Sequence, residues 1–534
     1  MKFKISSIFF TLLPNLFFAN TENTSGIGLD QRIDQAFQPF SDLVSNIVFF
    51  EVFSGAPFVI ILLVLSALFF TIYFGFPNIK YFVKAIGVVR GKYDHIDQSV
   101  SGNEELSIDG DIVDTISDES KEGEVTHFQA LATAVSGTVG NGNIAGVALA
   151  IALGGPGATF WMIVCGLLGM STKFVECTLG VQYRDIGKDG TVYGGPMYYL
   201  SKGLKEKGFN VLGKITAALF AVFCIGGSFG GGNAAQSNQA TIVIKDLMGL
   251  QSNSAGAFIG IILAFLVGII IIGGIKRIAS VTEKIVPFMA VLYLLSCIYI
   301  ILINITLVDD AVSLIISQAF NPKAIGVGGI IGVLLVGFKR AAFSNEAGAG
   351  SASIAHSAVK TKYSASEGLV ALLEPFIDTV VICTMTALVI IIFNFGGYFE
   401  YGGDGGMVYI DGVGYEGAGI TSKAFAQYIP FSNIFLTIAV VLFAVSTMIS
   451  WSYYGLQSWK FIFGRGYYAD LTYKILFLLF IVIGAASSMS SIWAFSDAMI
   501  FAMIFPNMVG LFFLFPVVKK ELSKYLDAIK KNNL

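Results

Sequence analysis

Apolar residues are grouped along this chain in runs of about 20, separated by shorter polar stretches. A helix needs about 20 apolar residues to cross a hydrocarbon core of about 30 Å, whereas the strands of a membrane barrel show short alternating segments. The pattern predicts an all-α polytopic membrane protein with about 11 transmembrane helices. The predicted spans are 54–76, 128–150, 158–178, 213–243, 255–275, 285–305, 325–345, 367–395, 431–456, 472–489 and 492–517.

Composition supports a membrane protein and narrows its class. Only 13% of the 534 residues are charged and the mean hydropathy is +0.75, whereas soluble domains carry about 25% charged residues. The sequence contains no GxxxxGK[ST] segment, which argues against ATP-driven transport within this chain. It also offers no convincing catalytic pair, and its 3 histidines argue against a metal centre. We therefore predict that the protein is not an enzyme.

Polar and charged segments divide the chain into a leader, an external segment, a first helix, a linker, a transporter core and a tail. Residues 1–19 resemble a secretory signal peptide, with a short membrane anchor as the alternative. We expect 20–53 to be an external segment, 54–76 a peripheral transmembrane helix, and 77–127 an acidic cytoplasmic linker. The predicted transporter core covers 128–518, and 519–534 is a basic cytoplasmic tail.

The distribution of cations predicts the orientation. If the first span enters from outside, the inside segments hold 27 of the 33 Lys and Arg. Cytoplasmic loops of membrane proteins carry an excess of Lys and Arg. The N-terminus is therefore expected outside and the C-terminus in the cytoplasm, as a multi-pass protein of the cell inner (plasma) membrane.

The segment 136–157 is apolar but rich in glycine, which disfavours a continuous helix by about 1 kcal/mol per residue relative to alanine. A dinucleotide fingerprint is excluded, because no strand or soluble βαβ unit surrounds it. Close helix packing at Gly142 and Gly146 is one interpretation, but it leaves Asn141 and Asn143 unexplained. The third interpretation is a broken helix that exposes backbone groups to a solute, as in secondary transporters.

A second glycine-rich segment begins about 200 residues later, and contains "GFKRAAFSNEAGAGSASIAH" at 337–356. The segment at 136–157 opens one run of five predicted spans, and this segment opens the next five in the opposite direction. Paired broken helices at matching positions of inverted repeats mark the binding site of many transporters. The two repeats are predicted at 128–305 and 325–518.

Several long motifs resemble the alanine or glycine:cation symporter family. They include "GTVGNGNIAGVALAIALGGPGATFWM", "GGPMYYL", "GGGNAAQSNQA", "KIVPFMAVLY" and "SWSYYG", in addition to the 337–356 segment. The resemblance spans about residues 50 to 520. It implies a leucine-transporter-type five-plus-five inverted repeat with one extra N-terminal helix. It further implies uptake of alanine, glycine or a similarly small amino acid, coupled to Na⁺ or, in some members, to H⁺.

The resemblance also implies site residues. Asn141 stands where the family usually has Thr, so the preferred amino acid is left open; Asn233 belongs to the "NxxQ" motif with Gln236. The expected substrate-binding residues are Thr138, Gly140, Asn141, Gly142, Asn143, Gln236, Phe343, Thr447 and Trp451. Gly137, Ser446 and Thr447 are expected to bind Na⁺. Each of these residues has a structural alternative, namely packing or a hydrogen bond within the helices.

Acidic residues inside membrane spans are candidates for gating or coupling. Glu346 is expected to pair with Lys339 or Arg340, either as a cytoplasmic gate or as a structural ion pair. Asp378 is the candidate proton site if the coupling ion is H⁺. His356 is expected at the cytoplasmic surface, as a solvated or packing residue.

The sequence therefore predicts a secondary active symporter that couples Na⁺ entry to uptake of alanine or glycine. An H⁺-coupled symporter of the same substrates is the alternative, and a passive small-solute channel is the rival from another class. The expected partners are a small neutral amino acid and membrane lipid, with no nucleic acid and no protein partner.

Overall fold

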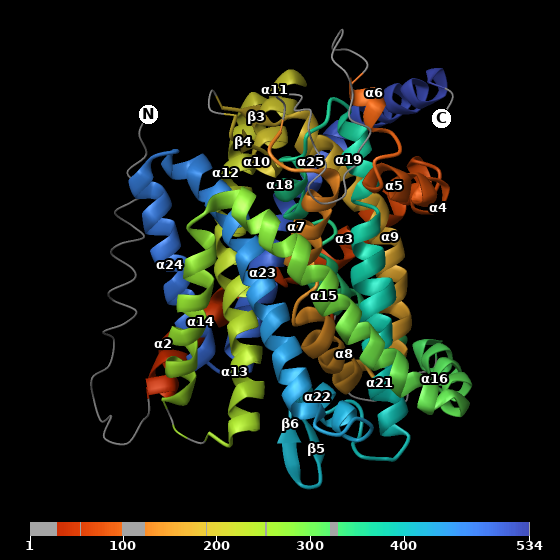
Figure 1. The fold of residues 1–534 in the computed structure, drawn as a ribbon, viewed down its shortest axis with the longest axis vertical. Coiled ribbons are helices and arrows are strands. Elements are labelled where there is room, and N and C mark those ends of the chain that lie inside the picture. Colours follow the sequence, from red (N-terminus) through yellow and green to blue (C-terminus); the bar gives the residue numbers. More distant parts are fainter. Residues whose placement is uncertain are drawn as a thin grey trace.

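The structure is a computed structural model that describes residues 29–53, 55–98, 123–187, 190–250, 252, 254–320 and 329–532. The predicted signal peptide, residues 99–122 of the acidic linker and the first residues of the span predicted at 325–345 lie outside the described residues. The described chain is a bundle of long helices with short β-hairpins and helices at its two ends (Figure 1).

The first five-helix unit begins at a capping box. Thr126 accepts a hydrogen bond from the Gln129 backbone N–H at 3.0 Å, and the Gln129 side chain accepts one from the Thr126 N–H at 3.2 Å; this pair satisfies donors that a helix start leaves free. The unit comprises α7 (His127–Thr138), η1 (Gly142–Gly146), α8 (Val147–Gly154), α9 (Gly157–Gln182), α12 (Asn210–Phe229), η3 (Gly230–Ala234), α13 (Ala235–Met248), α14 (Ala255–Ile271) and α15 (Gly274–Ile303).

The second five-helix unit repeats this order, beginning with a second broken helix. It comprises α17 (Gly329–Asn345), α18 (Ala352–His356), α19 (Ser364–Val370), α20 (Leu373–Pro375), η6 (Phe376–Cys383), α21 (Thr384–Asn394), α23 (Ser432–Phe463), α24 (Tyr467–Ala486) and α25 (Met489–Lys531). The two units interlock, because α17 packs on α9, α24 packs on α14, and α23 packs on both α12 and α15.

Within the described residues, each predicted span falls on helix. Seven of the described helical runs are long and apolar enough to cross a membrane, and the bent pair α7–α8 adds an eighth. The shorter apolar helices α3 (Phe58–Tyr73) and α14, and the broken α17, occupy the other predicted spans. The predicted fold class, a polytopic all-α protein with a five-plus-five repeat, is confirmed.

The two broken helices run in opposite directions through the bundle. In Figure 1 the chain passes from α7 in the upper half to α8 in the lower half, whereas α18 and α19, which follow α17, lie at the upper end. This is the inverted relation that the sequence predicts. Three segments within the long helices, η1, η3 and η6, are π-helical, and such turns are frequent at functional sites.

Smaller elements cover the ends of the bundle. At the lower end in Figure 1 lie β5 (Val408–Ile410), β6 (Val413–Tyr415), α22 (Ala418–Ala426) and α16 (Val308–Phe320). At the upper end lie α5 (Phe82–Val89), α6 (Asp94–Gln98), β3 (Asp185–Ile186), β4 (Val192–Tyr193), α10 (Pro196–Tyr198), η2 (Tyr199–Gly203) and α11 (Leu204–Glu206). The remaining elements are β1 (Glu51–Phe53), β2 (Ala56–Pro57), α4 (Pro77–Lys80), η4 (Ile305–Leu307) and η7 (Asp404–Gly406).

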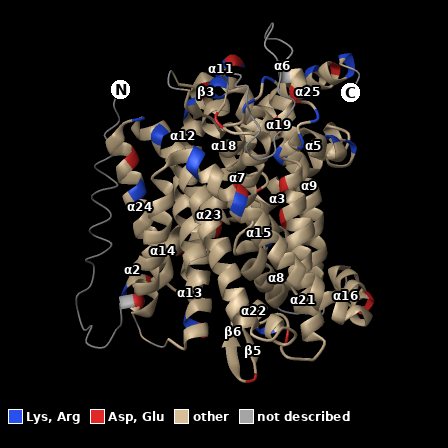
Figure 2. Ribbon diagram, viewed as in Figure 1, with Lys and Arg blue, Asp and Glu red and all other residues tan. Residues whose placement is uncertain are grey.

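Two terminal segments that are predicted outside the membrane spans contain regular helix. The predicted external segment contains α2 (Leu29–Val48), which packs on α14, α24 and α25. The predicted basic tail, from residue 519 on, continues α25 as far as Lys531. Most Lys and Arg residues lie in the upper half of the view, the half that contains the C-terminus (Figure 2).

Candidate functional site

The first broken helix bends by 51° between α7 and the η1–α8 run. Val139 leaves the helical conformation, with ψ 87°. The freed N–H of Gly140 donates to Asn143 Oδ1 at 2.8 Å. The break is therefore stabilised by a side chain of its own segment, as a buried backbone donor requires.

Gln236 of α13 binds the same break from the side. Its Oε1 accepts a hydrogen bond from the Asn141 N–H at 3.0 Å, and its backbone oxygen accepts one from Asn141 Nδ2 at 3.2 Å. Asn141 Oδ1 is buried and has no hydrogen-bond partner within the described part of the chain. Buried polar atoms normally have partners, so this oxygen is an acceptor available to a ligand. Asn233, by contrast, donates to the Phe477 backbone oxygen of α24 at 2.6 Å.

Gly140 lies where a side chain would not fit. A Cβ atom at this position would lie 3.0 Å from Gln236 Oε1 and closer still to Thr447 Oγ1. The first break, α13 and α23 therefore meet at Gly140, and the expected residues Gly140, Asn141, Gln236 and Thr447 lie together.

Exchanged hydrogen bonds join α7 to α23. Thr447 Oγ1 donates to the Ser136 backbone oxygen at 3.0 Å, and Ser136 Oγ donates to the Ser446 backbone oxygen at 2.8 Å. Ser446 Oγ donates to Phe443 O at 3.0 Å, within its own helix. Gly137 follows Ser136 and packs against Tyr454, whose hydroxyl would lie 2.9 Å from a Cβ there. The three expected Na⁺ ligands thus share one helix contact, which is rich in oxygen atoms.

The second break separates α17 from α18. Glu346 adopts a left-handed backbone conformation (φ 54°), followed by Gly348 (φ 95°) and Gly350 (φ 86°). The two breaks touch, because a Cβ on Gly142 would lie 3.4 Å from the Ser344 Cα. The predicted juxtaposition of two interrupted helices is present.

Asp378, in η6, lies at the junction of the two breaks. Its carboxylate accepts hydrogen bonds from Asn143 Nδ2 at 2.6 Å, from Ser344 Oγ at 2.9 Å and from Thr379 Oγ1 at 2.7 Å. The sequence singles out Asp378 as an acid within a span, and the structure adds that it contacts both broken helices. Thr138, the remaining expected residue of the first break, donates instead to carbonyl oxygens of its own helix.

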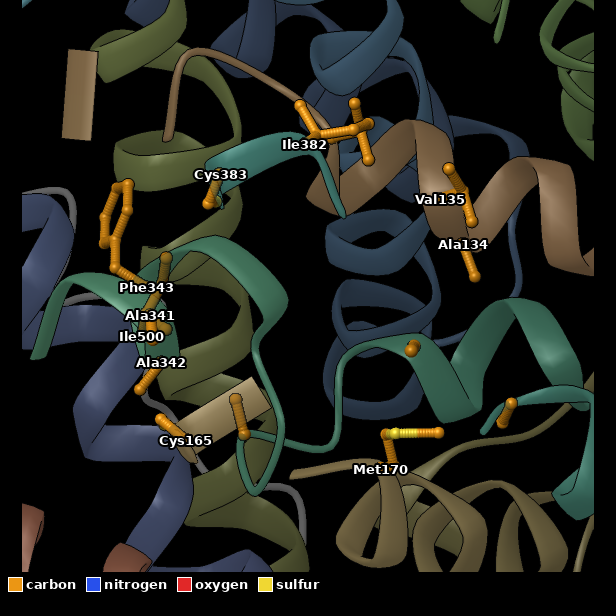
Figure 3. Close-up of a cluster of buried hydrophobic side chains, with 14 of the residues drawn as sticks. Ala134, Val135, Cys165, Met170, Ala341, Ala342, Phe343, Ile382, Cys383 and Ile500 are labelled. Carbon is orange, nitrogen blue, oxygen red and sulfur yellow. The ribbon is translucent and has the colours of Figure 1, made fainter. Parts of the chain in front are cut away.

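Apolar side chains from several helices surround the breaks. Figure 3 shows the labelled cluster with Phe343 of α17, Ile500 of α25 and Cys383 of η6 among its members. Phe343 stacks on Trp493 with ring centroids 4.9 Å apart. Ile500 and Phe343 both pack against Gly231 of η3.

The expected pairing of Glu346 with Lys339 or Arg340 is wrong. Arg340 forms an ion pair with Asp497 of α25, and Lys339 Nζ lies 3.0 Å from the same carboxylate. The Glu346 carboxylate instead accepts hydrogen bonds from Ser351 Oγ and from Trp451 Nε1. The left-handed turn at Glu346 separates its side chain from the helix that carries the two cations.

The expected surface position of His356 is also wrong. His356 is fully buried, and its Nδ1 contacts Glu367 Oε1 while its Nε2 lies 3.6 Å from Glu374 Oε2. His127 contacts the other oxygen of Glu367, and Lys173 Nζ lies 3.0 Å from Glu374 Oε1. We call these five side chains the buried ionic cluster. The cluster is not among the sequence predictions, although Lys173 in the middle of an apolar helix is a signal of buried charge.

Sequence comparisons find a family and relatives that match most of this chain. The sodium:alanine symporter family matches residues 41–534. The sodium/alanine symporter AgcS of Methanococcus maripaludis is 37% identical over 493 residues, which cover 92% of this chain and 99% of that protein. An uncharacterized transporter of Haemophilus influenzae is 36% identical, over 90% of this chain and 95% of that protein.

Among solved structures, MhsT in complex with L-phenylalanine aligns with a TM-score of 0.48 and 15% identity, over 75% of this chain and 99% of that chain. The family and the relatives with a stated role are transporters, and the apolar helices make this chain a multi-pass membrane protein. With a family match across most of its length and relatives above one-third identity, the chain belongs to the sodium:alanine symporter family.

Proposed function

We propose that this protein couples Na⁺ entry to the uptake of a small neutral amino acid, alanine or glycine, by alternating access. The observation that carries the proposal is the first break. There Asn141 offers a buried acceptor that has no partner among the described residues, beside Gly140, Gln236 and Thr447. The name of the relative AgcS, a sodium/alanine symporter, supports the same substrate and ion.

The proposed site suits both charged groups of an amino acid. Asn141 Oδ1 can accept a hydrogen bond from an ammonium group, which is a donor only. The start of the helical run that follows the break, at Gly142, carries the positive end of a helix dipole, which attracts a carboxylate. Phe343 and Trp451 then enclose the side chain of the substrate, together with Gly140 and Gln236.

The proposed Na⁺ site lies where α7 meets α23. Hard cations prefer oxygen ligands, and Thr447, Ser446 and the backbone near Gly137 supply hydroxyl and carbonyl oxygens there. Na⁺ in this place would bridge the two helices. Its binding would therefore be linked to the arrangement of the first break and so to the substrate.

The position of Asp378 supports a second candidate function, in which amino-acid uptake is coupled to H⁺ entry. A carboxylate that contacts both breaks would change its hydrogen bonds to Asn143 and Ser344 when it binds a proton. Proton binding there would thus affect the same junction that binds the substrate. The two candidates are separated by the ion gradient that drives uptake.

The cations support the proposed orientation, with the N-terminus outside and the C-terminus in the cytoplasm of the cell membrane. In that orientation α17 enters from outside, so the Arg340–Asp497 pair lies on the outer side of the second break. We assign this pair to the closed outer gate. Rocking of one helix bundle against the other would then expose the site alternately to the two sides.

The test is uptake of labelled alanine and glycine into proteoliposomes, with an inward Na⁺ gradient, an inward H⁺ gradient or neither, for the wild type and Asn141→Thr. Accumulation driven by Na⁺ is expected, and the ratio of alanine to glycine uptake should change in the variant. Accumulation driven only by H⁺ would favour coupling through Asp378. No accumulation of either amino acid would refute the proposed substrate class.

A further inference from the structure

We propose that Glu346 is a positioning residue that limits the size of the transported side chain, because it holds the indole of Trp451 against the site. This inference rests on the proposed function. It assigns Glu346 to substrate selection, in place of the gating role that its charge suggests in the sequence.

The contact itself is direct and buried. Trp451 Nε1 donates to Glu346 Oε1 at 2.9 Å, and the second carboxylate oxygen accepts a hydrogen bond from Ser351 Oγ. The exposed fractions are 0% for Trp451 and 3% for Glu346. A buried indole N–H needs an acceptor, and this carboxylate is the acceptor that it has among the described residues.

The indole lies beside the residues that surround the proposed substrate. Trp451 is one helical turn beyond Thr447 on α23, and Gly232 is one helical turn before Gln236 on the η3–α13 run. A Cβ atom at Gly232 would overlap the indole ring, and one at Gly227 would lie 3.3 Å from it. The indole therefore packs against glycines of α12 and η3, one helical turn from Thr447 and from Gln236, where it would close one side of the proposed site.

The position of Glu346 in the chain links this wall to the second break. Its left-handed backbone (φ 54°) is unusual for a residue other than glycine. This unfavourable backbone conformation occurs at a residue whose side chain accepts the hydrogen bond from the indole. Glycine would be easier to place here but would leave the indole N–H without its acceptor.

Removal of this acceptor would release the ring. A buried N–H without a partner is unfavourable, so the indole would turn toward another acceptor or toward water, and the site would become deeper. Rejection of a larger apolar side chain by a pocket depends on the volume that is available. A larger amino acid such as leucine should then be accepted more readily relative to alanine.

The experiment measures uptake of labelled leucine and labelled alanine in the same proteoliposomes for the wild type and four variants. Glu346→Ala removes the acceptor, and Trp451→Phe keeps a ring but removes the indole N–H. Glu346→Gln keeps an acceptor oxygen, and Ser351→Ala removes only the other partner of the carboxylate. These last two are the matched controls.

We expect the leucine-to-alanine ratio to rise by about tenfold in Glu346→Ala and in Trp451→Phe, and to stay near the wild-type value in the two controls. A ratio that is unchanged in Glu346→Ala, with uptake of the two amino acids reduced equally, would overturn the inference whatever Trp451→Phe does, because phenylalanine is also smaller than tryptophan. If Glu346→Ala does not fold, Glu346→Leu, which also removes the acceptor, takes its place. Wild-type protein that takes up neither alanine nor glycine would instead refute the proposed function.

Discussion

Asn143 donates a hydrogen bond to Asp378 over 2.6 Å, and through it the segment after the first break is joined to η6 of the second repeat. Ser344 donates to the other oxygen of the same carboxylate at 2.9 Å. A single acidic residue therefore contacts both interrupted helices, although these segments lie about 200 residues apart in the sequence. Movement of either break must alter the hydrogen bonds of Asp378.

We predict that Asp378→Asn reduces transport by at least about tenfold, which corresponds to about 1.4 kcal/mol. The amide removes the negative charge and has only one acceptor oxygen, so it cannot accept from Asn143 at one oxygen and from Ser344 at the other, as the carboxylate does. Uptake of labelled alanine into proteoliposomes measures the loss. Thr379→Val is the control, because it removes one hydrogen bond to the carboxylate and one from Asn345 Nδ2 but leaves the carboxylate in place. Wild-type uptake by Asp378→Asn would contradict the assignment.

Gly140→Ala should abolish uptake, because the added methyl group would collide with Thr447 Oγ1 and Gln236 Oε1. Overpacking of this kind is unfavourable by about 1–3 kcal/mol in a well-packed interior. Uptake and thermal stability in detergent measure the two effects. Gly466→Ala is the matched control, since no described residue other than its two chain neighbours has an atom within 4 Å of a Cβ there. Equal behaviour of the two variants would show that the space at Gly140 is not required.

Lys173→Met should lower the midpoint of thermal unfolding more than the double change Lys173→Met with Glu374→Gln does. The single change leaves the fully buried Glu374 carboxylate without its lysine. Loss of one partner of a buried ion pair is unfavourable by about 3–5 kcal/mol, whereas replacement of both is often tolerated. Thermal unfolding of the two variants measures the difference. The same midpoint in both would mean that His356, which also contacts Glu374, neutralises the carboxylate alone.

The runs of apolar residues were sufficient to predict the helices and their order, because the bilayer requires about 20 apolar residues for each span. Glycine and asparagine at 136–157 likewise indicated the first break. The partners of the charged residues could not be predicted in this way. Arg340 is near Glu346 in the sequence, yet it pairs with Asp497 of α25 because a left-handed turn intervenes.

The contacts of His356 likewise could not be predicted from its neighbours in the sequence. Its neighbours Lys360 and Lys362 suggest a surface, but the chain carries the imidazole into contact with Glu367 and Glu374. Such contacts depend on how separate helices meet. A pattern along one helix contains information on its own faces only.

The last prediction concerns α2, whose acidic side chains bind the ends of two membrane helices. Asp34 Oδ1 accepts hydrogen bonds from the Ser488 N–H at 2.9 Å and from Ser488 Oγ at 2.8 Å, just before α25 begins. Asp30 accepts hydrogen bonds from the N–H groups of Gly256 and Ala257 in the first turn of α14, at 3.2 and 3.3 Å. Helix starts carry free N–H groups and a partial positive charge, so these carboxylates act as caps supplied by another helix.

Asp34→Ala should therefore lower the free energy of unfolding by about 1 kcal/mol, the usual value of a lost helix cap. Thermal unfolding measures the change, and Asp42→Ala is the control because this exposed acid lies on the same helix. Since α25 also carries Asp497, the partner of Arg340, loss of the cap should loosen the same helix at the proposed outer gate. An equal effect of Asp34→Ala and Asp42→Ala would show that α2 does not hold the start of α25.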